Sequence, residues 1–442
     1  MKLRLLPAVL FGLLSPAWGT EVTFNRDIAP ILYARCTGCH RPNDIAPMSF
    51  LSYKETRPWS KAIREAVVSR RMPPWHADPR YGEFANDARL TEDEVAKIRA
   101  WVEGGSLEGD PKDLPPAPKF VEGWRLGTPD LEYAIPEVYQ VKSGGPDVNT
   151  TFRVPMNLKE DVWVQAVELR PGNRKVVHHA HVRIIPPEGL PKSGPKEADP
   201  SGVLDTSKPL TFSDEFGSHM RPEVPAIDDG CSHPGGGDYP GTDRLVGSVL
   251  ASYLPGRDPD RWPSGYAKRI PAGSTLEFQI HYSPATGKPE TDRTSVGFIV
   301  AKQPPKHEVL RRDLHNLFFK IPAGADNHRV TACYALDQDI VLLSYTPHMH
   351  YRGKSQRVEI TKPGAQPETI LNVPSYQFEW QTLYEFKEPL KLPKGTQIRI
   401  IAHFDNSRNN RSNPDPTKTV RWGSPSGEEM MDGWLEYITP KR

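Results

Sequence analysis

The strongest constraint on the fold of this chain is an internal repeat. Two segments, residues 271–282 and 393–404, align without a gap. Each starts with a Pro-x-Gly turn and continues as an alternating strand that ends on a histidine and an aromatic residue, His281-Tyr282 in one copy and His403-Phe404 in the other. A repeated supersecondary unit predicts a repeated domain. We therefore expect two related β domains, 123–303 and 304–442.

Proline usage agrees with a mainly β fold. The chain has 47 prolines in 442 residues, about twice the usual share. Short alternating runs such as 161–165 favour many strands and turns over helix bundles. The formal net charge of +1 gives no electrostatic reason to expect nucleic acid or an anionic membrane as a partner.

A histidine cluster precedes each copy of the repeat. In the second domain, His348 and His350 are two residues apart, so on a strand they share a face and can chelate one ion.

The cluster of the first domain, His178-His179-Ala180-His181, is less clear. Alternation places His179 and His181 on one face, whereas the adjacent His178 and His179 need a kink to reach the same ion. We expect His281, at the end of its repeat strand, to be the third ligand.

A third motif lies near the N-terminus. Cys36-Thr-Gly-Cys39-His40 has the spacing at which two thiols add to haem vinyl groups beside an axial imidazole. A Cys-x-x-Cys pair alone also occurs in zinc half-sites and redox pairs. The interpretation followed here is a covalent c-type haem. Haem favours copper over zinc at the histidine clusters, because zinc cannot exchange electrons with it and copper binds the same ligands more tightly.

Residues 1–19 predict a cleaved export signal. Lys2 and Arg4 precede an apolar run over 5–14, and small residues follow at 17–19. That run is about half of what a membrane-spanning helix needs. Export and haem attachment agree on an oxidising compartment. We expect a periplasmic or secreted protein with no stable membrane span.

Met72, in Arg71-Met72-Pro73-Pro74-Trp75, is the expected sixth haem ligand, with Met48 and His76 as rivals. A capping box at 91–94 opens a helix that stops at 104–105. The order of haem motif, methionine and closing helix resembles that of class I cytochromes c over residues 20–108. A proline-rich linker, 109–122, follows.

Four ordered motifs in the remaining chain resemble the copper type II, ascorbate-dependent monooxygenases, the family of the peptidylglycine and dopamine hydroxylases. The resemblance covers roughly Gly123 to Tyr437. The motifs are Val177-His178-His179, Phe278-Gln279-Ile280-His281-Tyr282, His348-Met349-His350 with Gly353-Lys354, and Glu428-Glu429-Met430.

This resemblance implies a fold of two antiparallel jelly-roll-like β-sandwich domains facing each other across a solvent-filled cleft. It also implies two copper ions and insertion of one oxygen atom of O2 into a C–H bond of a small-molecule substrate. Electrons would come from the haem, itself reduced by an external donor. Carried over to this sequence, the ligands of the electron-transfer copper are His178, His179 and His281, and those of the copper where oxygen reacts are His348, His350 and Met430.

Reasoning from the residues conflicts with the family at two points. Repeat symmetry nominates His403 in place of Met430, and strand alternation nominates His181 in place of His178. Our interpretation follows the family at both.

The chain differs from the peptidylglycine enzymes in two residues that would contact the substrate. Thr346 and Trp434 stand where those enzymes have arginine and tyrosine, so an uncharged or aromatic substrate is expected in place of a carboxylate.

Two further alternatives stay open at this point. Cys231 and Cys333 either form a disulfide or remain buried thiols. The first function considered is the monooxygenase. The second is a haem and copper protein that transfers electrons or binds a ligand but has no oxygenase activity. The third is a β scaffold stabilised by zinc.

Overall fold

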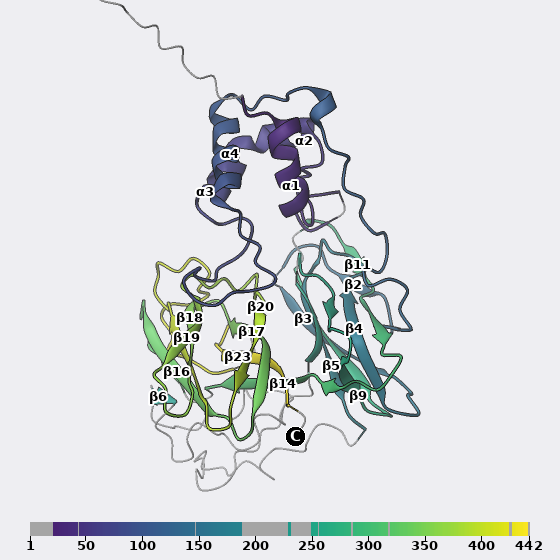
Figure 1. Cartoon of the computed structure of the whole chain (residues 1–442), viewed down its shortest axis with the longest axis vertical. Coiled ribbons are helices and arrows are strands. Elements are labelled where there is room, and N and C mark those ends of the chain that lie inside the picture. The colour runs from purple at the N-terminus through teal and green to yellow at the C-terminus, as the bar shows by residue number, and fades with distance from the viewer. Residues whose placement is uncertain are drawn as a thin grey trace, which may run out of the picture. The chain divides into compact units, whose positions relative to one another are not determined.

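The structure, a computed structural model, describes residues 21–42, 44–145, 147–187, 229–230, 249–254, 256–283, 286–316, 319–423 and 427–440. The expected export signal, residues 1–19, lies outside them. The prediction of a mainly β fold is confirmed (Figure 1). The chain divides into two compact units: Met1–Pro42 with Met48–Pro73 and Leu90–Pro118, and Asn43–Pro47 with Pro74–Arg89 and Lys119–Arg442.

The first unit is helical. Its core contains Phe24, Leu32, Ile98 and Trp101, all fully buried. Its helical elements are a π-helix Phe24–Ile28, α1 Ala29–Arg35, α2 Tyr53–Thr56, a 3₁₀ turn Arg57–Trp59, α3 Ser60–Val68, α4 Glu92–Glu103 and a 3₁₀ turn Pro111–Asp113.

Helix α4 begins and ends as the sequence predicts. The Thr91 hydroxyl accepts a hydrogen bond from the Glu94 amide at 3.1 Å, and the Glu94 carboxylate accepts one from the Thr91 amide at 2.7 Å. Gly104 is the C-terminal cap. The reciprocal bonds satisfy two amides that a helix start otherwise leaves unpaired.

The second unit contains two β-sandwiches. In the first, one sheet has the order β1 (Leu131–Ala134), β12 (Ser295–Val300), β4 (Val162–Arg170), β9 (Tyr266–Ile270) and β13 (His307–Glu308), with β8 (Asp260–Arg261) paired to β4. The other has the order β3 (Val148–Pro155), β10 (Thr275–Tyr282), β5 (Val177–Ile185) and β7 (Val249–Tyr253). A small ribbon joins β2 (Tyr139–Val141) and β11 (Glu290–Asp292).

The second sandwich is built the same way from two sheets. One has the order β14 (Leu310–His315), β23 (Met431–Ile438), β17 (Ile340–Met349) and β20 (Tyr384–Leu392). The other has the order β19 (Glu368–Val373), β18 (Gly353–Thr361), β21 (Gln397–Phe404), β16 (His328–Ala335) and β6 (Asp229–Gly230). A ribbon pairs β15 (Lys320–Ile321) with β22 (Val420–Arg421).

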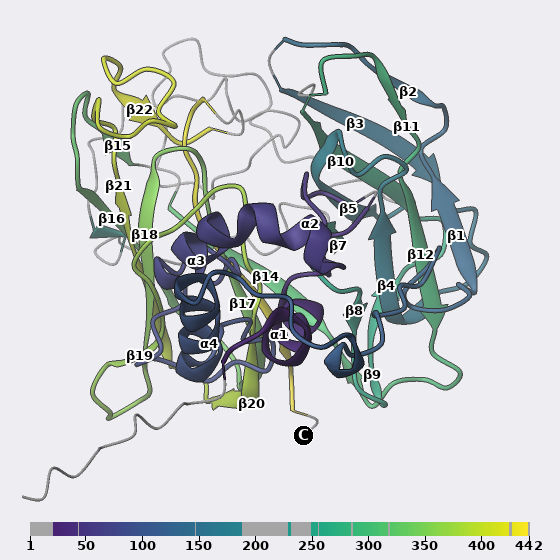
Figure 2. The ribbon, with the colours of Figure 1, turned by 90° about the horizontal axis from the view of Figure 1, so that it is seen from above.

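Each sandwich has its own apolar core, and the two lie side by side in this unit (Figure 2). Along β17, Leu342 and Tyr345 face the core of the second sandwich. On the same strand, Val341 and Leu343 pack against the core of the first. Strand β17 is therefore buried on both faces, which makes it a rigid support for the histidines at its end.

The two copies of the repeat form equivalent strands, β10 and β21. Each follows a turn in which the amide three residues after proline bonds back to it: Ser274 to Pro271 at 3.3 Å, and Thr396 to Pro393 at 3.0 Å. The turn glycines, Gly273 and Gly395, have φ of +71° and +82°. Glycine is favoured there because a side chain is strained at positive φ.

Residues 74–89 pack on the second sandwich. The amide of Asp78 donates to the carbonyl of Asn372 at 2.8 Å, and the ring of Trp75 meets that of Tyr384 at 4.9 Å. The region expected as one domain, 20–108, thus contributes this segment and Asn43–Pro47 to the second unit.

Cys333 is disulfide-bonded, and its expected partner Cys231 lies outside the described residues.

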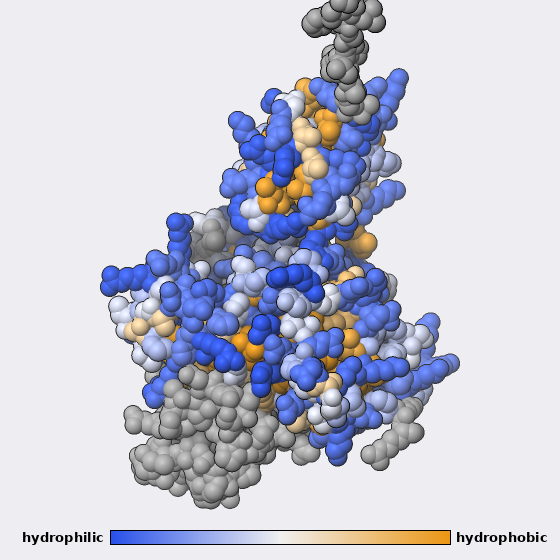
Figure 3. Space-filling model, turned by 60° about the vertical axis from the view of Figure 1, so that its left-hand side comes forward, coloured by the Kyte–Doolittle hydropathy of each residue, from blue (hydrophilic) through white to orange (hydrophobic). Residues whose placement is uncertain are grey.

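The face drawn in Figure 3 is mostly hydrophilic, with scattered apolar patches. Within the described part of the chain, every helix is too short or too polar to cross a membrane.

Candidate metal centres

Three histidines of the first sandwich converge. The Nδ1 atom of His179 lies 3.4 Å from that of His178 and 3.2 Å from that of His281. One ligand atom from each residue can be chosen so that all three lie within 4.8 Å of one another. Three imidazole nitrogens at this spacing can hold one metal ion.

A β-bulge brings the adjacent His178 and His179 to the same side. In the pairing of β10 with β5, His281 lies opposite His179, but Tyr282 lies opposite Val177. His178 is therefore the extra residue of a bulge, which turns its side chain out of the regular alternation. This is the kink that the sequence interpretation required.

Asp147 occupies the other nitrogen of His281. Its Oδ2 lies 2.9 Å from His281 Nε2. A carboxylate at this position favours a proton on Nε2, which leaves the lone pair on Nδ1, the atom that faces His179.

His181, the alternative nominated by strand alternation, has another partner. Its Nδ1 lies 2.8 Å from the hydroxyl oxygen of Ser252, the residue opposite it on β7. Its ring still lies near that of His179, with centroids 5.7 Å apart. The structure thus places His181 beside the group of three, in contact with a serine.

The second histidine pair lies at the end of β17. The rings of His348 and His350 are 5.3 Å apart and nearly perpendicular. Both residues are buried, with 8% and 4% of their surface exposed. Gln381 Oε1 lies 2.7 Å from His348 Nδ1, and the Glu428 carbonyl oxygen lies 3.1 Å from His350 Nδ1. Acceptors on both Nδ1 atoms leave both Nε2 atoms available to a metal.

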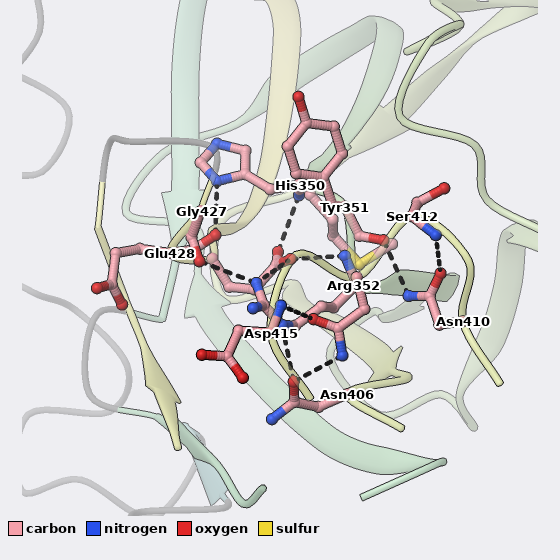
Figure 4. A network of polar contacts seen from close by, with 12 residues as sticks. His350, Tyr351, Arg352, Asn406, Asn410, Ser412, Asp415, Gly427 and Glu428 are labelled. Atoms are coloured by element: carbon pink, nitrogen blue, oxygen red, sulfur yellow. Dashed lines mark hydrogen bonds and ion pairs between the residues drawn. The ribbon is translucent and has the colours of Figure 1, made fainter. Parts of the chain in front are cut away.

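Arg352 and Glu429 form a buried ion pair, with 3.9 Å between nitrogen and oxygen, in the polar network around His350 (Figure 4). Glu429 accepts hydrogen bonds from the amides of His350 at 2.9 Å and Arg352 at 2.7 Å. Arg352 is 1% exposed and donates to Asn406 Oδ1 at 2.8 Å and to the Gly427 carbonyl at 2.9 Å. These bonds join the end of β17 to the segment before β23.

Strand register predicts on which face Met430, the residue just before β23, lies. In the pairing of β17 with β23, His348 lies opposite Asp432 and Met349 opposite Met431. Met349 and Met431 are fully buried in the core. Alternation therefore directs half-buried Met430 to the same face as His348 and His350.

His403, which repeat symmetry nominated instead, lies on the other sheet of the sandwich. On β21 it alternates with the core residues Ala402 and Phe404, and its Nδ1 lies 3.1 Å from the hydroxyl of Ser355. Symmetry fails here because β10 pairs with the strand that carries its histidine cluster, whereas β21 pairs with β16 and β18 and not with β17.

The histidines of both groups are held neutral. Burial lowers the pKa of His178, His281 and His348, and burial together with neighbouring histidines lowers that of His179 well below its usual value. Burial and His348 lower the pKa of His350 to about 3. Neutral imidazole is the form that binds metal, so these sites need not lose a proton first.

Two aromatic side chains connect the sandwiches here, and one of them, Phe378, contacts both groups. The ring of Phe378 lies 5.9 Å from that of His179 and 5.8 Å from that of His350. Trp434 stacks on His348 at 4.6 Å and meets His181 edge-on at 5.8 Å. The expected solvent-filled cleft is thus bridged at two places by side chains, because the two sandwiches approach each other closely at this point.

Thr346 and Trp434, the residues that depart from the peptidylglycine enzymes, line one small pocket between the sandwiches. Its charged walls include Arg257 and Arg311. Both guanidinium groups have carboxylate partners: Asp260 lies 2.5 Å from Arg257, and Asp313 lies 2.8 Å from Arg311.

The haem motif lies after α1 in the first unit. The amides of Cys39 and His40 both donate to the Cys36 carbonyl, at 3.1 Å and 2.9 Å. This turn places two thiols and an imidazole on one short segment, as covalent haem requires. Burial raises the pKa of the Cys36 thiol to about 12.

The candidate sixth ligands fall in different units. Met48 and Met72 belong to the helical unit, whereas His76 belongs to the segment that packs with the second unit. Met48 packs against the helical core. Met72 is half-buried just after α3, and its amide donates to the Ala66 carbonyl at 3.2 Å.

Sequence reasoning missed the residues that hold the histidine rings: Asp147, Phe378 and Gln381. Phe378 and Gln381 come from the loop between β19 and β20, and Asp147 comes from the residues before β3. No motif marks them. Their roles come from tertiary contacts with strands more than 25 residues away in the sequence.

No family model and no curated protein matches the sequence. Among solved structures, the chain is similar to the major capsid protein P2 from bacteriophage PM2, with 9% identity, 71% of this chain and 98% of that chain covered, and a TM-score of 0.24. It is also similar to PNGF-II, with 11% identity, 70% and 66% covered, and a TM-score of 0.28. At such scores the likeness carries no argument about function.

Proposed function

We propose that this chain is an exported, copper-dependent monooxygenase that hydroxylates a C–H bond of a small molecule with O2. His178, His179 and His281 would hold one copper ion, and His348, His350 and Met430 a second. Cys36, Cys39 and His40 would hold a c-type haem, with Met72 as its sixth ligand. An external donor would reduce the haem.

The observation that carries the proposal is the presence of two groups of neutral imidazoles, one half-buried and one buried, that offer different ring nitrogens to a metal. The first group presents Nδ1 atoms 3.2 to 3.4 Å apart. The second has acceptors on its Nδ1 atoms and presents Nε2. Two inequivalent sites suit two roles, because ligand number and geometry tune how a metal binds and reacts.

Copper supplies the one-electron chemistry and the open position at which O2 can react. The residues of this chain supply the rest. Gln381 and Glu428 orient the second pair, Glu429 and Arg352 fix the end of β17, and Phe378 and Trp434 provide packed contacts between the sites in place of bulk water.

The charges around Trp434 favour an uncharged substrate over a charged one. Arg257 and Arg311, in the wall of the small pocket there, already have carboxylate partners. A carboxylate substrate would have to displace one of these partners, which leaves a buried charge without compensation. Thr346 offers a hydroxyl as the neutral polar contact.

Metal analysis of the exported protein, with optical and electron paramagnetic resonance (EPR) spectra, tests the proposal. We expect one haem and two inequivalent copper ions per chain, and oxygen uptake by the reduced protein coupled to hydroxylation of a trial aromatic substrate. Zinc in both sites would overturn the proposal. Two coppers and a haem without oxygen uptake would instead favour an electron-transfer or ligand-binding protein.

A further inference from the structure

We propose that Gln381 is the positioning residue of the second metal site. Its carbonyl oxygen would hold His348 in the Nδ1–H form, so that Nε2 faces the metal, and its amide N–H group would donate to the molecule that binds beside His348. This inference rests on the proposed function, because it assigns a role at the second of the two sites.

The contact between Gln381 and His348 is short and buried. Gln381 Oε1 lies 2.7 Å from His348 Nδ1, and Gln381 is only 1% exposed. A hydrogen bond shielded from water in this way is electrostatically stronger than one at the surface. It therefore selects one tautomer of His348.

The backbone at Gln381 is strained. Its φ is +38°, a region that residues other than glycine rarely adopt. Such strain persists only where the surrounding structure imposes it, and it concentrates at functional sites. Here the backbone conformation serves to direct a glutamine side chain at His348.

The rest of the loop fixes Gln381 against β17. The hydroxyl of Tyr376 donates to the Met349 carbonyl at 2.8 Å and accepts from the Met349 amide at 3.1 Å. Two hydrogen bonds thus join the loop to the residue between His348 and His350. These bonds fix the loop that carries Gln381 relative to His348 and His350.

The amide nitrogen of Gln381 points to a bound molecule next to His348. Gln381 Nε2 is buried and has no hydrogen-bond partner among the residues that the structure describes. A buried donor without a partner is unfavourable, so it usually marks a place where a ligand or water completes the bonding. A molecule bound next to His348 would provide that acceptor.

The opposite orientation of the amide makes a contrary prediction. If Nε2 of Gln381 donated to His348 Nδ1, the ring proton would sit on Nε2 and block metal binding there. A carboxylate can only accept a hydrogen bond when ionised. Replacing Gln381 by glutamate therefore distinguishes the two orientations.

The experiment compares Gln381→Leu, Gln381→Glu and the wild type by copper titration and EPR. We expect Gln381→Leu to weaken copper binding at the second site by about 10-fold to 100-fold, the usual effect of losing a hydrogen bond to a metal-bound histidine. Gln381→Glu should keep wild-type copper affinity. Copper at the three-histidine site should be unchanged in both variants.

Gln377→Leu is the matched control, because it makes the same change four residues earlier in the same loop. It should bind copper like the wild type. Equal affinity in Gln381→Leu and the wild type would overturn the positioning role, as would loss of copper in Gln381→Glu to the level of Gln381→Leu. A wild-type chain that binds copper at the first site alone would overturn the proposed function as well.

Binding of dimethyl sulfoxide to the copper-loaded protein tests the donor role. This molecule is a hydrogen-bond acceptor without net charge, so the carboxylate of Gln381→Glu does not repel it as it would an anion. We expect its affinity to fall at least tenfold in Gln381→Glu, where copper is retained but the N–H donor is gone. Unchanged affinity in that variant would overturn the donor role.

Discussion

At the scale of single residues, each candidate site depends on the hydrogen-bond partner of a histidine ring nitrogen that would not bind the metal. Asp147 lies on His281 Nε2, and Gln381 lies on His348 Nδ1. These partners decide which nitrogen keeps its lone pair. The histidines alone would not distinguish the two sites.

Replacing Asp147 by alanine should weaken copper binding at the three-histidine site by about tenfold, because His281 loses the acceptor that fixes its tautomer. Asp147→Asn should have a smaller effect, since its amide oxygen can still accept a hydrogen bond. The second site should be unaffected. Copper titration monitored by EPR measures both sites. Asp161→Ala, an aspartate that contacts Ala272 and Arg269, is the control; an equal loss there would contradict the prediction.

Acid should destabilise the metal-free protein through its neutral histidines. The pKa of His350 is about 3 in the folded chain, against an ordinary value of 6.5. Between these values the unfolded chain binds a proton that the folded chain does not, so stability falls as pH drops below 6.5. The slope is about 1.4 kcal/mol per pH unit for such a histidine.

Urea unfolding of the metal-free protein at pH 7, 5.5 and 4.5 measures this slope. The variant His350→Gln, which cannot be protonated, should lose stability less steeply over the same range. Identical slopes for the two proteins would show that His350 does not titrate as its burial requires.

At the scale of secondary-structure elements, the sites depend on departures from regular geometry. The bulge on β5 brings His178 to the side of His179. The loop between β19 and β20 supplies Tyr376, Phe378 and Gln381. Alternation along a strand was the rule available from the sequence, and it selected His181 because no sequence signal marks the bulge.

The pairing of β23 with β17 leaves no room for a side chain at Gly433. A methyl group there would lie 2.0 Å from the Tyr345 hydroxyl and 2.6 Å from Ile400 Cδ1. Gly433→Ala should therefore destabilise the fold by about 1–3 kcal/mol and weaken copper binding at the second site. Denaturant unfolding and copper titration provide the measurements. Gly427→Ala, where a methyl group meets no atom of the described residues within 4 Å, should leave stability unchanged.

At the scale of the whole molecule, the two units have separate apolar cores. The helical unit carries the haem motif, and the β unit carries both histidine groups. Loss of the haem should therefore leave both histidine groups able to bind copper, since each unit has an apolar core of its own among the described residues.

The double variant Cys36→Ala with Cys39→Ala tests this independence. Mass spectrometry should show covalent haem in the wild type and none in the variant, because both thioether attachments are gone. Copper content should stay at the wild-type value. Loss of copper together with haem would show that the β unit does not fold independently. Wild-type chain without covalent haem would contradict the proposed cofactor itself.

The sequence by itself determined the elements that follow from local chemistry. The turn and strand of each repeat, the capping box of α4 and the mainly β fold depend on patterns within a few residues. The sequence also placed the histidine clusters on strands. Local rules suffice for these features because glycine turns, capping side chains and alternation act over short distances.

Tertiary structure alone decided which side chains meet. It joined Asp147 to His281 across 134 residues and Gln381 to His348 across 33. It also placed His403 on a different sheet from His348, against the symmetry of the repeat. Such contacts depend on strand register and sheet order, and these are set by the packing of two complete cores, which no short segment encodes.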